Sequence, residues 1–338
     1  VSITITASET EICAGALVIF TALAVNGGPG AAYHWRINGA AVTGATDLTY
    51  QYEPDDSDLV DCILTSDAIC ATGNPALSNT ISMTVNPLMP VAVTVTASET
   101  EICAGTPVTF TAAAVNGGTG ATYQWRILGV ATPGATNDTY HYTPDNSDVV
   151  DCILSSDATC ATGNPASSNA VSMTVNPLLP VSVTITASET VVCAGTLVTF
   201  SAAPVNGGPG AAFQWRIGGT DVPGATGAAY QYAPSNGDIV DCLLTSDETC
   251  ATGSPALSNA IPVTVNPLLP VSITITASET EVCAGTPVIF TSSAVNGGPG
   301  ATYQWRVGGT AIPGATDHAY QFIPGSGDVV DCIVTSDA

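Results

Sequence analysis

The chain has 338 residues, and its formal net charge at pH 7 is −24, because 28 acidic residues stand against four arginines and no lysine. Such an excess of negative charge repels nucleic-acid backbones and anionic lipid surfaces, so we expect no nucleic-acid partner. No apolar run approaches the roughly 20 residues that a membrane-spanning helix needs, so we expect no membrane insertion.

One unit of sequence is repeated along the whole chain. Val1, Val91, Val181 and Val271 open four copies at a constant spacing of 90 residues. A period of this length is that of a small domain rather than of a solenoid unit. The expected domains are 1–90, 91–180, 181–270 and 271–338, the last without its closing strand. The linkers 86–90, 176–180 and 266–270 each hold two prolines, which predicts short, semi-rigid joints.

The first half of a copy predicts two strands separated by turns. In the second copy, "VAVTVTAS" (91–98) alternates with period 2, as a half-buried strand does. After a turn, "PVTFTAAAV" (107–115) places Val108 and Phe110 on one face. The glycine-rich segment 116–120 then interrupts the pattern and predicts a turn.

The second half of the copy predicts further short strands. "TYQWRI" (122–127) sends Trp125 inward, "DVVDCILSS" (148–156) sends Cys152 inward, and "NAVSMTVN" (169–176) closes the copy. Seven or eight short strands without a helical pattern indicate an all-β chain, a tandem array of immunoglobulin-like β-sandwiches. A tryptophan on the third long strand is typical of such a core. The expected core tryptophans are Trp35, Trp125, Trp215 and Trp305.

An arginine and an aspartate recur on two of these strands. Strand parity points both outward, on strands that neighbour each other in an immunoglobulin-like sheet, which predicts a structural cross-strand ion pair. Recognition of a ligand by the arginine is the alternative. The pairs are Arg36/Asp61, Arg126/Asp151, Arg216/Asp241 and Arg306/Asp331.

The segments "CAGTPVTFTA" (103–112), "YQWRI" (123–127) and "DVVDCILSSDATCATGNPA" (148–166) resemble the Ig-like repeats of large bacterial surface proteins. Many of those proteins are exported by the type IX secretion route and serve as adhesins, gliding filaments or other appendages. The resemblance covers essentially every copy. It implies an Ig-like fold and an extracellular location, either attached to the cell surface or secreted.

Each complete copy holds three cysteines, which in lysine-free, Thr- and Ser-rich repeats favours an oxidising, extracellular setting. Loop-closure entropy favours Cys103–Cys160 at about 4 kcal/mol over Cys152–Cys160 at about 2.5 kcal/mol. It does not separate Cys103–Cys160 from Cys103–Cys152, and a bond between domains or between chains is a third possibility.

The resembling repeats that carry two cysteines keep those that match Cys103 and Cys160. The resemblance therefore implies one bond within each complete copy. The expected bonds are Cys13–Cys70, Cys103–Cys160 and Cys193–Cys250. The expected buried free thiols are Cys62, Cys152, Cys242 and Cys332. Cys283 would have no partner within the sequence.

No arrangement of residues indicates an enzyme or a cofactor. His34, His141 and His318 occupy three different positions in their copies, so no histidine belongs to the repeated unit. Catalysis by a Ser-His or Cys-His pair therefore has no repeated base. Three cysteines without a repeated fourth ligand favour a disulfide over zinc.

Calcium is the metal that the acidic turn 53–61 brings into question. Asp55, Asp56 and Asp58 cluster there, and calcium prefers clustered carboxylate oxygens. The third copy has lost the extra acids, because its turn 233–241 is "APSNGDIVD". A solvated acidic turn is therefore preferred to a metal site.

The expected function is that of structural spacer repeats in an extracellular filament, appendage or giant adhesin, extending a terminal binding domain. The alternative is that the repeats are glycan- or protein-binding modules that act directly in adhesion. A non-catalytic extension of an enzyme is a third possibility. The expected partners are identical chains in a filament or bundle, and a host, prey or matrix surface reached through domains outside these residues.

Overall fold

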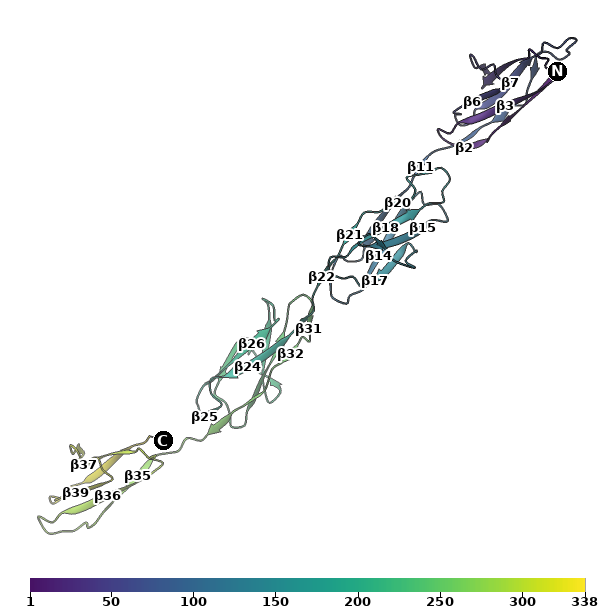
Figure 1. Cartoon of the computed structure of the whole chain (residues 1–338). Coiled ribbons are helices and arrows are strands. Elements are labelled where there is room, and N and C mark those ends of the chain that lie inside the picture. The colour runs from purple at the N-terminus through teal and green to yellow at the C-terminus, as the bar shows by residue number, and fades with distance from the viewer. Residues whose placement is uncertain (338) are drawn as a thin grey trace. The chain divides into compact units, whose positions relative to one another are not determined.

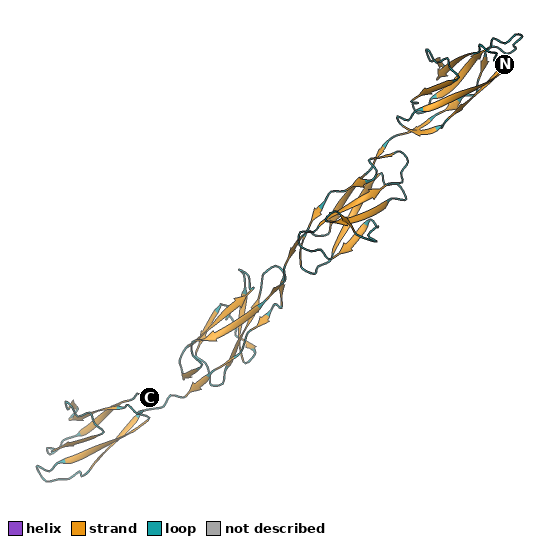
Figure 2. Ribbon diagram, in the orientation of Figure 1, coloured by secondary structure: helices purple, strands orange, loops and turns teal. Residues whose placement is uncertain are grey.

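The computed structural model describes residues 1–337. All regular secondary structure among these residues is β-strand (Figure 2). This described part contains no helix capable of spanning a membrane. The chain divides into two compact units, Val1–Leu178 and Leu179–Ala338. The division falls inside the second linker, so each unit holds two copies of the repeat.

The first repeat contains ten short strands (Figure 1). They are β1 (Ser2–Ala7), β2 (Glu11–Cys13), β3 (Val18–Val25), β4 (Ala32–Ile37), β5 (Ala40–Ala41), β6 (Thr49–Tyr52), β7 (Leu59–Thr65), β8 (Ala76–Leu77), β9 (Ile81–Ser82) and β10 (Thr84–Asn86). One sheet has the order β1-β3-β6, and the other has the order β5-β4-β7-β8, with β9 also on β7. Strand β10 pairs in parallel with β2. This strand order is that of an Ig-like β-sandwich.

The alternation of the sequence determines which side chains fill the space between the sheets. On β3, Val18, Phe20 and Ala22 are buried, whereas Ile19 and Leu23 between and after them are exposed. Successive side chains of a strand point to opposite faces, so a period-2 pattern buries one face only. Burial of such side chains supplies the main favourable free energy of the fold.

A tryptophan lies at the centre of each sandwich. Trp35 on β4 is fully buried, its ring centroid is 6.3 Å from that of Phe20, and its Nε1 donates to the carbonyl of Asp47 at 2.9 Å. The indole's single donor is therefore paired inside the core. The corresponding Nε1 bonds of Trp125, Trp215 and Trp305, also fully buried, reach the carbonyls of Asn137, Gly227 and Asp317 at 2.9 Å each.

The second repeat has the same strands and two more, namely a linker strand and the short strand β19 that pairs with it. Its elements are β11 (Met89–Pro90), β12 (Ala92–Ala97), β13 (Glu101–Cys103), β14 (Val108–Val115), β15 (Thr122–Ile127), β16 (Val130–Ala131), β17 (Thr139–Tyr142), β18 (Val149–Ser155), β19 (Ala161–Thr162), β20 (Ala166–Ser167), β21 (Val171–Ser172) and β22 (Thr174–Asn176). The closing segment is two strands rather than one. Strand β21 pairs with β18, and β22 pairs in parallel with β13. Met173 between them is buried and bonds to the backbone of residues 147 and 148.

The second unit contains the last two repeats. The third repeat and its linker comprise β23 (Leu179–Pro180), β24 (Ser182–Ala187), β25 (Val191–Cys193), β26 (Val198–Val205), β27 (Ala212–Ile217), β28 (Thr220–Asp221), β29 (Ala229–Tyr232), β30 (Ile239–Thr245), β31 (Ala251–Thr252), β32 (Ala256–Leu257), β33 (Ile261–Pro262) and β34 (Thr264–Asn266). The fourth comprises β35 (Ser272–Ala277), β36 (Val288–Val295), β37 (Thr302–Val307), β38 (Thr310–Ala311), β39 (Ala319–Phe322) and β40 (Val330–Thr335).

Buried hydrophobic clusters follow the repeats. In the described residues they extend from Ile3 to Met83, from Val91 to Met173 and from Val181 to Val263, so each lies inside one of the expected domains. The fourth repeat is less completely covered. The inward side chains of β35 are half-buried, whereas those of β1 are buried. The sequence stops before counterparts of β8–β10, which supply Met83 to the first core.

Candidate functional site: the joint between repeats

The end of the first repeat brings Cys13 to the point where the chain leaves the sandwich. Parallel pairing of β2 with β10 places Cys13 opposite Asn86, and the amide of Ala14 donates to the carbonyl of Asn86 at 2.9 Å. Asn86 is the last residue of β10 and leads directly into the linker. Cys13 therefore lies at the exit of the first repeat.

The linker is bonded to the second repeat along its backbone. Its strand β11 pairs in parallel with β19, and the amide of Met89 donates to the carbonyl of Cys160 at 2.9 Å. The side-chain amide of Asn116 donates to the carbonyl of Pro90 at 2.7 Å. Because proline has no N–H, its carbonyl is the polar backbone group that needs a partner here. The linker is thus a short strand of the second repeat rather than a free tether.

A disulfide joins these two places. Cys13 is bonded to Cys160, with a Cα–Cα distance of 5.4 Å, within the usual range for a disulfide. The bond closes a loop with a sequence separation of 147 residues. A crosslink of that span removes about 5 kcal/mol of chain entropy from the unfolded state. Since each partner belongs to a different repeat, the bond also restricts the movement of one sandwich against the next.

The expected bonds within single repeats are wrong. Cys13 is bonded to Cys160 instead of Cys70, and Cys70 and Cys193 are exposed free thiols. The reason is the position of the cysteines at opposite ends of the sandwich. Cys70 lies near the place where the chain enters, since the amino group of Val1 donates to the carbonyl of Thr72 at 2.8 Å. Cys13 lies where the chain leaves, and loop-closure entropy contains no information about this separation.

The cysteines of the other repeats that correspond to Cys13 and Cys70 are likewise either disulfide-bonded or exposed and free. Cys103 and Cys250 are each disulfide-bonded, so the expected bonds Cys103–Cys160 and Cys193–Cys250 are also wrong. Cys283 is an exposed free thiol.

The remaining cysteines are buried in the sandwiches. Cys62, Cys152 and Cys242 are fully buried free thiols, and Cys332 in the less covered fourth repeat is partly exposed. Burial raises the pKa of each of these thiols, because it penalises the charged thiolate. Such thiols behave as small apolar side chains rather than as nucleophiles.

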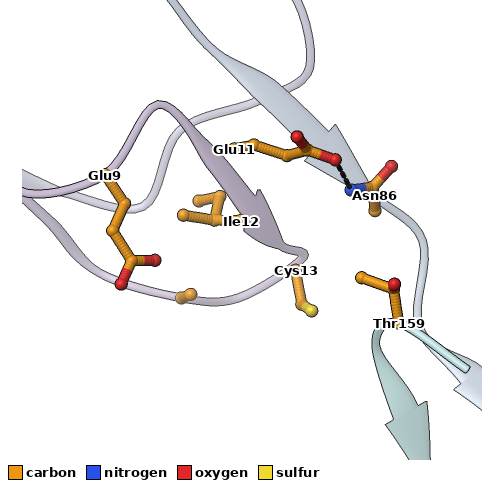
Figure 3. Close-up of a pocket in the computed structure, with 7 residues that line it drawn as sticks. Glu9, Glu11, Ile12, Cys13, Asn86 and Thr159 are labelled. Carbon is orange, nitrogen blue, oxygen red and sulfur yellow. Dashed lines mark hydrogen bonds between the residues drawn. The ribbon is translucent and has the colours of Figure 1, made fainter. Parts of the chain in front are cut away.

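A groove lies beside the joint (Figure 3). It has a volume of about 510 Å³ and an acidic rim formed by Glu9 and Glu11. Figure 3 shows Thr159 of the second repeat facing Cys13 of the first across this groove. Glu11 is held in place because its Oε1 accepts a hydrogen bond from the side chain of Asn86 at 2.9 Å. The groove is therefore a place where two repeats meet.

The recurrent arginines and aspartates form ion pairs with two hydrogen bonds each. Arg36 lies opposite Asp61 in the ladder of β4 and β7, and its Nε and Nη2 donate to the two carboxylate oxygens at 2.6 and 2.8 Å. Arg126–Asp151, Arg216–Asp241 and Arg306–Asp331 repeat this geometry. Hydrogen bonding to the aspartate raises the pKa of each arginine.

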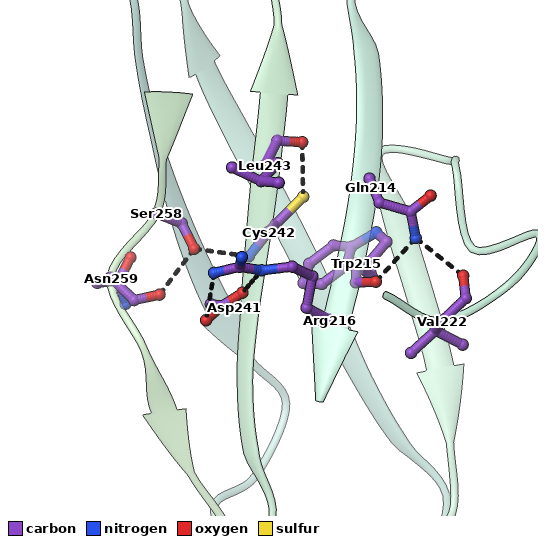
Figure 4. Close-up of polar contacts among 9 residues, drawn as sticks. All are labelled: Gln214, Trp215, Arg216, Val222, Asp241, Cys242, Leu243, Ser258 and Asn259. Carbon is purple, nitrogen blue, oxygen red and sulfur yellow. Dashed lines mark hydrogen bonds and ion pairs between the residues drawn. The ribbon is translucent and has the colours of Figure 1, made fainter. Parts of the chain in front are cut away.

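These pairs are more covered than strand parity alone predicts. The Asp61 side chain is only 11% exposed, whereas that of Asp331 in the fourth repeat is 45% exposed. Figure 4 shows Ser258 and Asn259, which follow β32, beside the Arg216–Asp241 pair. The fourth repeat has no counterpart of that segment in the sequence. The structural interpretation of the pair is thus favoured over a freely exposed arginine awaiting a ligand.

Asp58 has a structural role that the sequence analysis did not identify. Its carboxylate accepts hydrogen bonds from the side chain of Asn38, the hydroxyl of Tyr52 and the amide of Asp55, at 2.7, 3.1 and 3.0 Å. It caps the turn before β7. The signal in the sequence was that this aspartate is kept in every copy, as Asp148, Asp238 and Asp328.

Asp56 of this turn is also used by the fold. Asp56 accepts a hydrogen bond from the amide of Val85 at 2.9 Å. Asn146 and Asn236 occupy the same position in the next two repeats and accept the equivalent bond at 2.9 Å each. The bond therefore does not require a carboxylate. Among residues 1–337 no cluster of His, Cys, Asp or Glu suited to a metal ion is found.

An asparagine missed by the sequence analysis closes one edge of each of the first three sandwiches. The side chain of Asn79 accepts from the amide of Ile5 at 2.8 Å and donates to the carbonyl of the same residue at 3.1 Å. It thereby takes the place of a neighbouring strand on β1. Asn169 and Asn259 do the same for Val95 and Ile185. The recurring "SN" pair at 78–79, 168–169 and 258–259 was the available signal.

No family model matches the chain. Over 191 residues, which are 54% of the chain and 46% of the relative, it is 32% identical to the highly immunogenic outer capsid protein of Enterobacteria phage T4. The chain thus spans about half the length of this curated relative.

Solved structures that align with the chain include the N-terminal eight Ig domains of Down Syndrome Cell Adhesion Molecule. That alignment has 12% identity and a TM-score of 0.30, over 99% of this chain and 54% of the other. The three N-terminal domains of the bacteriophage RB49 highly immunogenic outer capsid protein align with 12% identity and a TM-score of 0.27. Here 79% of this chain and 99% of the other are covered. The strand order of its own repeats makes the chain a tandem array of Ig-like domains, and over half its length it is similar to an outer capsid protein of a phage.

Proposed function

We propose that the chain is a structural spacer in an extracellular filament, appendage or giant adhesin, and that its repeats extend a terminal binding domain from a surface. The observation that carries this proposal is the joint between the first two repeats. There a disulfide and a linker strand attach one sandwich to the next. A spacer needs joints of this kind, because a freely hinged array would not hold its end away from a surface.

The chemistry of the chain supports an extracellular setting for this role. Disulfides persist in oxidising compartments and are rare in the cytosol. A net charge of −24 keeps a long array soluble and disfavours contact with nucleic acid or anionic lipid. Contact with a host, prey or matrix surface would then belong to domains outside these residues. Identical chains could bundle where salt screens their charge.

Small-angle scattering on the oxidised 338-residue chain tests this role. Strands of about eight residues at about 3.3 Å each, with their loops, give sandwiches about 40 Å long, so four in line reach on the order of 150 Å. We expect that maximum dimension with or without a calcium chelator. A compact particle, or an extended one that becomes flexible only when calcium is removed, would contradict the proposal.

Cys13→Ser supplies the matched control for the joint. This variant should retain its folded sandwiches, shown by an unchanged circular dichroism spectrum, but should give a scattering profile of greater flexibility. Cys62→Ser changes a buried thiol outside the joint and should leave the flexibility unchanged. If Cys13→Ser and the unmodified chain scatter identically, the disulfide does not contribute to the stiffness of the spacer.

The similarity to a phage outer capsid protein favours a second candidate, in which the surface carrying the repeats is that of a virus particle. Antibodies against the chain, used in immunogold electron microscopy, distinguish the two surfaces. Label on cell appendages supports the first candidate, and label on capsids supports the second. Binding of the isolated chain to glycans or host proteins would instead favour direct adhesion by the repeats.

A further inference from the structure

Two positions of the repeat hold all the cysteines involved in the joints. We call Cys13, Cys103, Cys193 and Cys283 the exit cysteines, because they lie on the short strand beside the end of each sandwich or at its counterpart. We call Cys70, Cys160 and Cys250 the entry cysteines, because they lie near the start of each sandwich. The bond between Cys13 and Cys160 joins the exit cysteine of one repeat to the entry cysteine of the next.

The spacing of the bond between Cys13 and Cys160 predicts where the partner of each free cysteine at these positions would lie. An exit cysteine and its partner are 147 positions apart, as in Cys13–Cys160. By the same spacing, Cys193 would pair with position 340 and Cys283 with position 430, and Cys70 would pair with a position before residue 1. These are the three exposed free thiols of the structure.

The free entry cysteine already has the conformation of its bonded counterparts. The φ angle of Cys70 is 61°, and those of Cys160 and Cys250 are 60° and 65°. A positive φ is uncommon for a residue other than glycine. The first two of these turns are closed by the same backbone hydrogen bond, in which Ala71 donates to the carbonyl of Ala68 and Ala161 to that of Ala158, at 3.3 Å each. The turn of Cys70 is therefore shaped for a disulfide that it does not have.

The residue before Cys70 points to the same partner. Ile69 is 95% exposed, although it is a large apolar residue. Its counterpart Thr159 lines the groove at the exit of the first repeat. A second exit groove of the same kind would take Ile69 out of water, which is favourable for an apolar side chain.

The backbone around the free exit cysteine of the third repeat matches that around the bonded exit cysteine of the first. Cys193 lies opposite Asn266 in the parallel ladder of β25 and β34, as Cys13 lies opposite Asn86. The amide of Ala194 donates to the carbonyl of Asn266 at 2.9 Å, the same distance as between Ala14 and Asn86. The framework that holds a bonded exit cysteine is therefore already present around a free one.

We propose that Cys70, Cys193 and Cys283 each form a disulfide with the complementary cysteine of another repeat of the same kind. Entry cysteines pair with exit cysteines only. The partner repeat belongs either to the same polypeptide or to a second copy of the chain. Forming each bond removes two protons and two electrons from two thiols. The disulfide of a thiol–disulfide oxidoreductase, or a small-molecule disulfide, accepts them and becomes two thiols.

Oxidation of the 338-residue chain with a small-molecule disulfide tests the pairing rule between copies. The reaction is run in about 1 M salt, where the Debye length of about 3 Å screens the acidic rims. We expect covalent multimers whose crosslinked peptides join Cys70 to Cys193 or Cys283. Cys70→Ser should abolish the multimers, whereas Cys152→Ser, which removes a buried thiol, should leave them. Crosslinks of Cys70 to Cys70, or of Cys193 to Cys283, at comparable yield would overturn the rule.

A longer chain tests the same rule within one polypeptide. Residues 249–270 are appended after Ala338, which completes the fourth repeat and places a cysteine at position 340. We expect Cys193 to become resistant to alkylation and to be recovered in a peptide joined to the added cysteine, while Cys70 and Cys283 stay reactive. Appending the same segment with serine in place of its cysteine should leave Cys193 reactive. If Cys193 and the added cysteine are both free after oxidation, the proposal is wrong.

Discussion

The hydroxyl of Tyr142 donates a hydrogen bond to Asp148 at 3.1 Å, and the same pair recurs as Tyr52 with Asp58 and as Tyr232 with Asp238. In the fourth repeat, Phe322 occupies the position of the tyrosine. Burial, together with the neighbouring aspartate, raises the pKa of the three tyrosines well above the ordinary value near 10. The fold thus keeps these phenols protonated.

Alkaline pH should therefore destabilise the chain through these tyrosines. Their folded pKa is higher than the unfolded one, so their contribution is fully present below about pH 10 and is lost as pH rises through the folded pKa. The triple variant Tyr52→Phe, Tyr142→Phe, Tyr232→Phe should lose less stability between pH 8 and pH 11 than the unmodified chain. Thermal unfolding at both pH values measures the difference. Tyr33→Phe is the control, and an equal loss in both variants would contradict the prediction.

Removal of the arginine should have a different effect in a covered and in an exposed ion pair. We expect Arg126→Ala to cost about 1 to 3 kcal/mol, because it leaves Asp151 largely covered without its charged partner. The side chain of Asp151 is 18% exposed and that of Asp331 is 45% exposed. Arg306→Ala should therefore cost less than Arg126→Ala. Urea unfolding measures both, and equal costs would show that cover does not determine the strength of the pair.

Truncation of the central tryptophan should be more damaging than either change. Trp125 is fully buried and its Nε1 is paired, so Trp125→Ala creates a large cavity and should cost about 3 to 5 kcal/mol. The exposed apolar residue Val130 serves as a control, and Val130→Ala should cost little. If Trp125→Ala lowers the free energy of unfolding no more than Arg126→Ala does, the inward and outward faces of β15 are assigned wrongly.

The acidic turn should be insensitive to calcium. Asp56→Asn should change the stability by less than about 0.5 kcal/mol, because Asn146 and Asn236 make the same hydrogen bond. Asp58→Ala removes an acceptor of three hydrogen bonds and should cost about 2 to 3 kcal/mol. Thermal unfolding is measured with added calcium and with a chelator. A loss of stability in chelator that Asp56→Asn abolishes would revive the metal site.

Local patterns were enough to predict the sandwich, because they depend on which face of a strand is buried. The alternation around Trp125 predicted the core residue and the outward arginine, Arg126. A matching alternation around Cys152 predicted that Asp151 is the cross-strand partner of this arginine. The closing segment was harder. Its alternation continues through Met173, but hydrogen bonds to the preceding turn divide it into β21 and β22, which pair with different strands.

The disulfide could not be predicted from one copy of the repeat. The sequence separation of Cys103 and Cys160 suits a bond within the copy. The resemblance of the copy to repeats that carry only two cysteines also favours this bond. Which end of the sandwich each cysteine occupies depends on the parallel pairing of β13 with β22 and on the contact of β11 with β19. Both are long-range pairings, and the second involves the preceding copy.

The bond between Cys13 and Cys160 has a mechanical consequence. Tension transmitted along the backbone would cross from one sulfur to the other and bypass the residues between them. A segment of 147 positions could otherwise be drawn out to about 500 Å when its sandwiches unravel. With the crosslink in place, neither the body of the first sandwich nor most of the second lies on the load-bearing path. Reducing agents would then act as a release that lengthens the chain under load.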